Sequence, residues 1–162
     1  MVYIMEIYVD GGCRGNGKPW AIGATAAAFK KRNGKHKGYR RALPSHPRPT
    51  SQRAEIAAII LALKKALRIR KHLLTNPYLD VTIYSDSRYA VGCMTRWIHK
   101  WANNGWTNAR GDEVANRDLI ERASDLDDRL NRVGDVSYVY IPREQNQHAD
   151  KLCNICLDEQ EE

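Results

Sequence analysis

The chain has 162 residues, of which 43% are hydrophobic and 28% charged, and its formal net charge is +7. This length suits one domain with its own core, and the composition is ordinary for a globular protein. No apolar run approaches the ~18 residues of a membrane span, and no basic flank with an apolar stretch precedes the first strand pattern. We therefore expect one domain over residues 1–162, no membrane partner, a monomer, and a cytoplasmic or nuclear location.

Cysteine usage and charge distribution narrow the class of protein. Four scattered cysteines are too few for a disulfide scaffold, and one CxxC, Cys153 and Cys156, lacks the second pair of a closed zinc site. Residues 30–71 hold 14 Lys or Arg and one acid, which suggests nucleic acid as a partner, although a solvated basic face explains the charge equally well. The acidic residues 158–162 are expected to form a flexible tail.

In chain order, the pattern first predicts three antiparallel strands. Alternation over residues 3–10 indicates a strand with one buried face, and Gly11 and Gly12 end it in a tight loop. Residues 20–30 and 35–43 form two more strands. An Asn-Gly pair between them is typical of a hairpin, because both residues tolerate positive φ.

Helices and two more strands follow. Prolines break the pattern before residue 50, and Thr50 or Ser51 then caps a helix that runs to about Lys71 with an apolar face. The remaining pattern predicts a strand, two short helices, a longer helix, a strand and a last helix, over residues 79–85, 87–95, 97–103, 116–129, 136–141 and 146–157. This order describes an α/β domain with a five-stranded mixed sheet, three antiparallel strands and then two parallel ones, flanked by helices.

Four acidic residues stand at the ends of these elements. Asp10 and Asp86 follow the first and fourth strands, whereas Glu55 lies in the first turn of the long helix and Asp150 in the last helix. If the two strands are adjacent and parallel, both aspartates emerge at the sheet edge where ligand sites form. Each acid alone could be a cap or a solvated carboxylate. Four together suggest a Mg²⁺ site, because convergent carboxylates repel one another unless a cation holds them.

Such a site favours phosphodiester hydrolysis. Four carboxylates can hold two divalent metal ions about 4 Å apart, one to activate water and one to stabilise the leaving oxygen. A metal-dependent nuclease would also account for the basic region, since its substrate is a polyanion.

Around the four acids the sequence resembles type 1 ribonuclease H. The matching blocks are Tyr8–Cys13, Thr50–Glu55, Tyr84–Ser87 and His148–Leu152, in the order and near the spacing of that family. The resemblance covers nearly the whole chain. It implies an RNase H fold and Mg²⁺-dependent cleavage of the RNA strand of an RNA–DNA hybrid, with Mn²⁺ able to replace Mg²⁺. The implied catalytic and metal-binding residues are Asp10, Glu55, Asp86 and Asp150.

The resemblance also implies a surface that binds the hybrid. Asn16 and Gln52 resemble residues that contact the RNA backbone and its 2′-hydroxyls, and Ser51 stands where Asn is common, so these contacts should be weaker. Arg48, Thr50 and Asn116 resemble the family's pocket for a DNA phosphate. Trp97 and Trp101 resemble the aromatic residues that line its DNA channel. Without the resemblance, the four-residue spacing of the two tryptophans is more typical of core.

The sequence departs from the family before the last helix. The loop over residues 142–150 is shorter than usual and lacks the family's mobile histidine, which in that family helps to move protons and release product. His148, Arg143 or Glu144 could replace it, although His148 and Asp150 project from different faces of a helix. We expect a slower ribonuclease H, since losing a general acid–base group typically costs ~10²–10⁴ in rate.

Two other functions remain alternatives. A nucleic-acid-binding module that keeps the fold without catalysis is consistent with the missing histidine, but a pure binder gains nothing from four clustered acids near a polyanion. A proofreading exonuclease on a related fold usually opens with Asp-x-Glu on its first strand, whereas Asp10 is followed by two glycines here.

Overall fold

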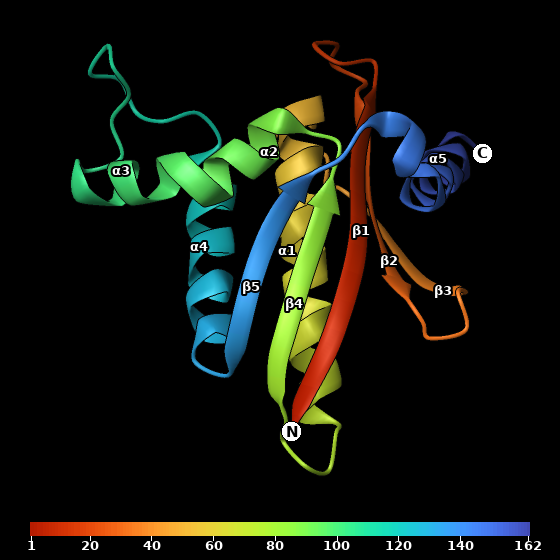
Figure 1. Cartoon of the computed structure of the whole chain (residues 1–162). Helices are drawn as coiled ribbons and strands as arrows, with labels where there is room; N and C mark the ends of the chain where they lie inside the picture. The colour runs from red at the N-terminus through yellow and green to blue at the C-terminus, as the bar shows by residue number, and fades with distance from the viewer.

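A computed structural model describes residues 1–162 and contains one five-stranded sheet (Figure 1). The strand order is β3–β2–β1–β4–β5, and the strands are β1 (Val2–Arg14), β2 (Ile22–Lys30), β3 (His36–Ala42), β4 (Tyr78–Ser85) and β5 (Gly134–Tyr140). The pairs β1–β2 and β2–β3 are antiparallel, whereas β1–β4 and β4–β5 are parallel. The predicted mixed sheet is confirmed, and intervening helices provide the crossovers that its parallel pairs require.

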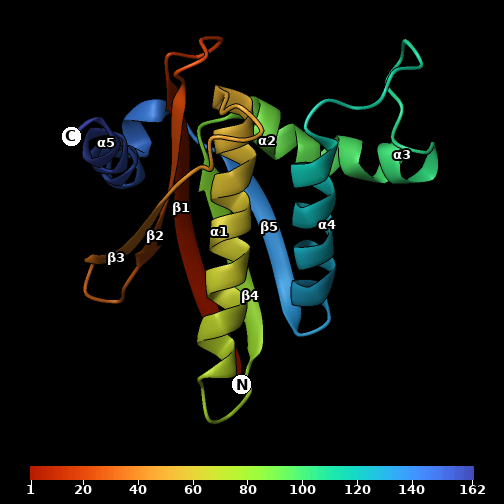
Figure 2. The same ribbon diagram turned by 180° about the vertical axis from the view of Figure 1, so that it is seen from behind.

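Helices cover the two faces of the sheet unequally (Figures 1 and 2). α1 (Ser51–Lys71) and α4 (Arg117–Asn131) lie side by side on one face, and α5 (Gln147–Glu161) packs on β1, β2 and β3 from the other. A short 3-10 turn, η2 (Arg143–Gln145), precedes α5. None of the helices combines the length and apolarity that a bilayer crossing requires.

Two apolar clusters hold these layers together. The larger lies between α1 and the sheet, and its fully buried members include Ile7, Val9, Ile59, Leu63 and Ile83. The smaller lies beneath α5 and consists of Ala24, Ala26, Cys153, Cys156 and Leu157. Both cysteines of the CxxC are therefore free thiols buried in the core.

The segment after β4 is one helical run, and the two separate helices predicted there are wrong. α2 (Arg88–Gly92) continues through a π-helical turn, η1 (Cys93–Trp97), into α3 (Ile98–Asn103). Backbone angles stay helical at Trp97, so nothing breaks the chain there. The turn brings the Trp97 ring against Gly92, where a Cβ would lie 2.9 Å from it.

β1 continues to Arg14 instead of ending in the predicted loop, because Gly11 and Gly12 both pair with β2. Glycine is required at position 11, since a Cβ there would lie 2.2 Å from the carbonyl carbon and oxygen of Ala54. This close approach lets the first turn of α1 contact β1. It therefore brings Glu55 to the strand position that carries Asp10.

The acidic tail that we expected to be flexible is instead the end of α5. Residues 158–161 continue the helix, and three of their carboxylates pair with arginines of the sheet. The pairs are Arg14–Asp158 at 2.8 Å, Arg14–Glu161 at 3.0 Å and Arg40–Glu159 at 2.9 Å. The sequence pattern could not show these partners, because they lie far apart along the chain.

We predict that Gly11→Ala destabilises the protein by about 3 kcal/mol, at the upper end of the cost of overpacking, because the backbone of Ala54 cannot rotate away. Urea unfolding measures the loss. Gly12→Ala is the matched control, since a Cβ there would meet the Cys153 sulfur at 3.3 Å, and a side chain can shift. Equal losses in the two variants would contradict a specific role for the close approach at Gly11.

Candidate active site

The parallel register of β1 and β4 places Asp10 beside Asp86. Val9 pairs with Ser85 at the last position of the ladder, so the next residue on each strand is an aspartate. Both side chains are half-buried. The carboxyl ends of parallel strands meet at one edge of a sheet, and ligand sites form there.

Glu55 reaches the same edge from the first turn of α1. Its carboxylate accepts a hydrogen bond from the Ser87 hydroxyl, and that hydroxyl accepts one from the Ala90 amide and so caps α2. Burial raises the pKa of Glu55; the Ser87 hydrogen bond opposes this, and the charge of Asp86 adds to it. Glu55 is thus fixed against the turn that carries Asp86.

Asp150 enters from α5, and Asn146 holds that helix in place. Asn146 is 1% exposed, and its Nδ2 donates to the carbonyl of Val9 at 2.8 Å. Its own backbone carbonyl accepts from the Asp150 amide at 3.0 Å. Asn146 therefore ties the start of α5 to the residue directly before Asp10. Sequence analysis missed this role, because an asparagine at a helix start is ordinarily a cap, and here its side chain caps nothing.

The acids at this edge repel one another. The pKa of Asp10 is raised to about 8, first by burial and then by the charges of Asp86 and Asp150 and a hydrogen bond with Asp150. Electrostatic interactions link the acids in pairs, Asp10 with Asp86 and Asp150, and Glu55 with Asp86. No three His, Cys, Asp or Glu side chains form a ready-made metal-ligand group. The donor set nevertheless fits Mg²⁺, which prefers carboxylate oxygens and would offset the repulsion.

The three residues considered as replacements for the missing histidine differ in position. The positive charge of Arg143 in η2 partly offsets the rise in the pKa of Asp10. His148 instead stacks on His36 of β3, with 3.9 Å between ring centroids and an interplanar angle of 21°. Glu144 is exposed. Of the three residues, Arg143 is thus the one with an electrostatic effect on Asp10.

The predicted polar contacts to the hybrid lie around the first turn of α1. Thr50 is its N-cap and accepts from the Arg53 amide at 3.1 Å. Asn16, in the turn after β1, accepts from the Ser51 amide at 3.4 Å. These contacts confirm the predicted cap and place the tip of the β1–β2 connection beside the helix N-terminus. Arg48, two residues before the cap, is exposed.

A second set of contacts extends this surface toward α4. Gln52 accepts from Asn116 Nδ2 at 3.5 Å, and the same Nδ2 donates to the Tyr89 hydroxyl at 2.9 Å. Asn116 has φ +63°, a left-handed conformation that Asn tolerates better than most residues. Sequence analysis missed Tyr89, because its link to Asn116 joins distant parts of the chain.

Aromatic rings lead away from this surface along the α2–α3 run. Tyr89, Trp97, Trp101 and Trp106 follow one another with centroid distances of 6.4, 5.9 and 6.4 Å. Trp97 is 36% exposed, whereas Trp101 is partly buried against the main core. The two predicted channel residues therefore differ: the Trp97 ring is exposed at the surface, whereas the Trp101 ring packs between Trp97 and the core.

The comparisons with known proteins agree with this geometry. The RNase H family model matches residues 3–155. This chain belongs to the RNase H family. A ribonuclease H of Pelobacter propionicus is 35% identical over 159 residues, which cover 96% of this chain and 85% of the relative. The predicted family and enzyme class, ribonuclease H, are therefore confirmed.

Two solved structures share the fold of this RNase H family member. RNase H1 of the archaeon Halobacterium salinarum superposes with a TM-score of 0.65 at 23% identity, over 97% of this chain and 99% of that one. A foamy viral protease–reverse transcriptase in complex with RNA/DNA hybrid gives a TM-score of 0.73 at 23% identity, over 94% of this chain and 20% of the viral one.

We predict that Asn146→Ala destabilises this RNase H by about 1–3 kcal/mol, the cost of leaving the buried Val9 carbonyl without its donor. It should also slow catalysis, because the start of α5 positions Asp150. Urea unfolding and initial rates measure the two effects. The control is exposed Gln147→Ala, which should change stability by less than about 0.5 kcal/mol. An Asn146→Ala protein as stable as the parent would contradict the anchoring role.

Proposed function

We propose that this ribonuclease H cleaves the RNA strand of RNA–DNA hybrids with two divalent metal ions, Mg²⁺ or Mn²⁺. The observations that support the proposal are the interactions of Asp10 with Asp86 and Asp150, and of Glu55 with Asp86, at one sheet edge. Burial and then these neighbouring charges raise the pKa of Asp10. When bound, the metal ions supply a hydroxide-like nucleophile and offset the charge that develops at phosphorus.

The chain's own residues hold and orient these carboxylates. Ser87 keeps Glu55 against the Asp86 turn, and Asn146 keeps the start of α5 against β1. Such supporting contacts matter because a ligand that can swing away loses affinity for its metal. All of these residues belong to one chain, so we propose that a monomer suffices for activity.

The polar surface around the α1 N-terminus would recognise the hybrid. Amide and hydroxyl groups of Asn16, Ser51 and Gln52 can contact 2′-hydroxyls, which distinguish the RNA strand from the DNA strand. Arg48, Thr50 and Asn116 would hold a DNA phosphate at the N-terminus of α1, where the helix dipole favours an anion. Trp97 would contact the DNA strand, with Trp101 packed behind it.

Arg143 would take over part of the role of the missing histidine. Arginine stays protonated, so it cannot shuttle a proton, but it can hold a phosphate oxygen in a charge-assisted hydrogen bond. The fold therefore supports positioning of the scissile or product phosphate by Arg143, with proton transfer left to water. This division accounts for our expectation of a slower enzyme with altered product release.

A second candidate function is a nucleic-acid-binding module with little or no catalysis. The shortened loop without the family's histidine favours it. The converging carboxylates oppose it, because a cluster of acids weakens the binding of a polyanion unless metal ions are held there.

We expect the protein to cleave the labelled RNA strand of a hybrid with Mg²⁺ or Mn²⁺ and to stop when the metal is chelated. Asp10→Asn should abolish cleavage, and Arg143→Ala should slow it by about 10–100-fold, the usual effect of losing a supporting group. His148→Ala serves as the control, since its ring stacks on His36. Tight hybrid binding by the unaltered protein, with no cleavage under either metal, would establish the binding module instead.

A further inference from the structure

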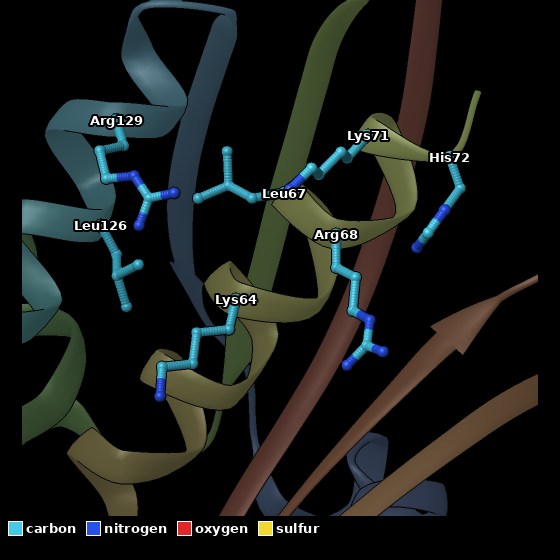
Figure 3. Close-up of a pocket in the computed structure, with 7 residues that line it drawn as sticks. All are labelled: Lys64, Leu67, Arg68, Lys71, His72, Leu126 and Arg129. Carbon is cyan, nitrogen blue, oxygen red and sulfur yellow. The ribbon is translucent and has the colours of Figure 1, made fainter. Parts of the chain in front are cut away.

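A groove lined by unpaired cations lies between α1 and α4 on the helical face of the molecule (Figure 3). Its volume is about 480 Å³, and its lining residues are Lys64, Leu67, Arg68, Lys71, His72, Leu126 and Arg129. No acid lines it. None of its lysines or arginines forms an ion pair, although Arg14, Arg40, Arg53 and Arg117 do so elsewhere.

The cations stand in rows along the two helices. Lys64, Arg68 and Lys71 follow one another at four- and three-residue intervals, so they share one side of α1 (Figure 3). On α4, Arg122 precedes Arg129 by two turns, and Asp125 between them pairs with neither. Like charges at these spacings destabilise a helix slightly, and a bound polyanion would reverse that effect.

A smaller groove of about 180 Å³ continues this basic surface toward the active site. Lys64 lines both grooves, and the smaller one is also lined by Arg41, Arg53 and Arg122. Burial and the charges of Arg122 and Arg41 lower the pKa of Lys64, so three cations meet between β3, α1 and α4. Arg53 is paired with Asp118 at 2.7 Å, so the unpaired cations begin beyond it.

The length of this surface suits a nucleic-acid backbone. It follows α1 from Arg53, directly after Gln52, to Lys71, which is about 27 Å of helix. At about 3.4 Å per phosphate, the rise of a stacked strand, that distance matches at most roughly eight nucleotides. The apolar floor, Leu67 and Leu126, can meet sugar carbons while the cations meet phosphates.

We propose that the groove between α1 and α4 is an auxiliary binding site for the sugar–phosphate backbone of nucleic acid that extends beyond the hybrid at the catalytic site. Its continuity with the α1 N-terminus and its regular cation spacing favour nucleic acid over an acidic protein. The inference rests on the proposed function in one respect: the strand in the groove is taken to extend from a hybrid bound at the catalytic site. Backbone binding in the groove does not itself require cleavage.

The test uses Asp10→Asn protein, so that binding is measured without cleavage. The probes are a short hybrid and the same hybrid with a single-stranded DNA extension of about ten nucleotides, long enough to follow the groove. Arg68→Glu with Lys71→Glu removes two groove cations. Lys31→Glu with Lys35→Glu makes the same charge change in the β2–β3 connection, where neither side chain lines the groove.

The extension should tighten binding to the Asp10→Asn parent and to the control, and the groove variant should lose most of this gain. The magnitude of the slope of log K against log salt for the extended probe should decrease by about 1.4, and two such single-strand contacts are worth about sevenfold in affinity between 50 and 200 mM salt. On the active background, the groove variant should cleave the short hybrid at the parent rate.

Three outcomes would overturn the proposal: no gain from the extension, equal losses in the groove and control variants, or equal losses on the short and extended probes. An acidic-protein site would appear as the first of these. If the active protein proves unable to cleave hybrids but the groove variant still loses the extension's gain, the auxiliary site stands while the proposed activity fails.

Discussion

Mutual repulsion among carboxylates at one sheet edge is the constraint on which the rest of the site depends. Three structural features hold the acids together against it. The β1–β4 register aligns Asp10 with Asp86, the missing Cβ of Gly11 admits the first turn of α1, and Asn146 fixes the start of α5. Contacts of the sheet and of two helices thus offset the repulsion among the carboxylates, and a bound cation would reduce that repulsion.

The carboxylates at the sheet edge and the cations along α1 and α4 form two separate charged surfaces of the molecule. The acids at the C-terminus of α5 form ion pairs with Arg14 and Arg40, so they do not neutralise the cations of α1 and α4. Cations without an ion-pair partner, Lys64, Arg68 and Arg129 among them, therefore line the face that carries α1. A positive surface beside the carboxylates raises the local concentration of a polyanionic substrate, which those carboxylates alone would repel.

Much of the fold could be predicted from the sequence, because strand alternation, the Thr50 cap and the helical periodicity of α1 are local signals. The meeting of Asp10 and Asp86 followed from strand ends once the two strands were taken as parallel. The errors arose where distant contacts decide the structure. Gly11 is a strand residue because α1 packs on it, and residues 158–161 are helical beside sheet arginines. Asn146 and Tyr89 act through partners that no local pattern identifies.

Thermal unfolding of the metal-free protein as a function of pH measures most directly the cost of burying Asp10 beside the charges of Asp86 and Asp150. Asp10 keeps its proton to about pH 8 in the native state but loses it near 3.8 when unfolded, so native stability should fall as pH rises between these values. Asp10→Asn should lack this fall and melt higher than the wild type at pH 8. Mg²⁺ should stabilise the wild type more than the variant. A variant that melts at or below the wild type, with no response of either to Mg²⁺, would contradict the account.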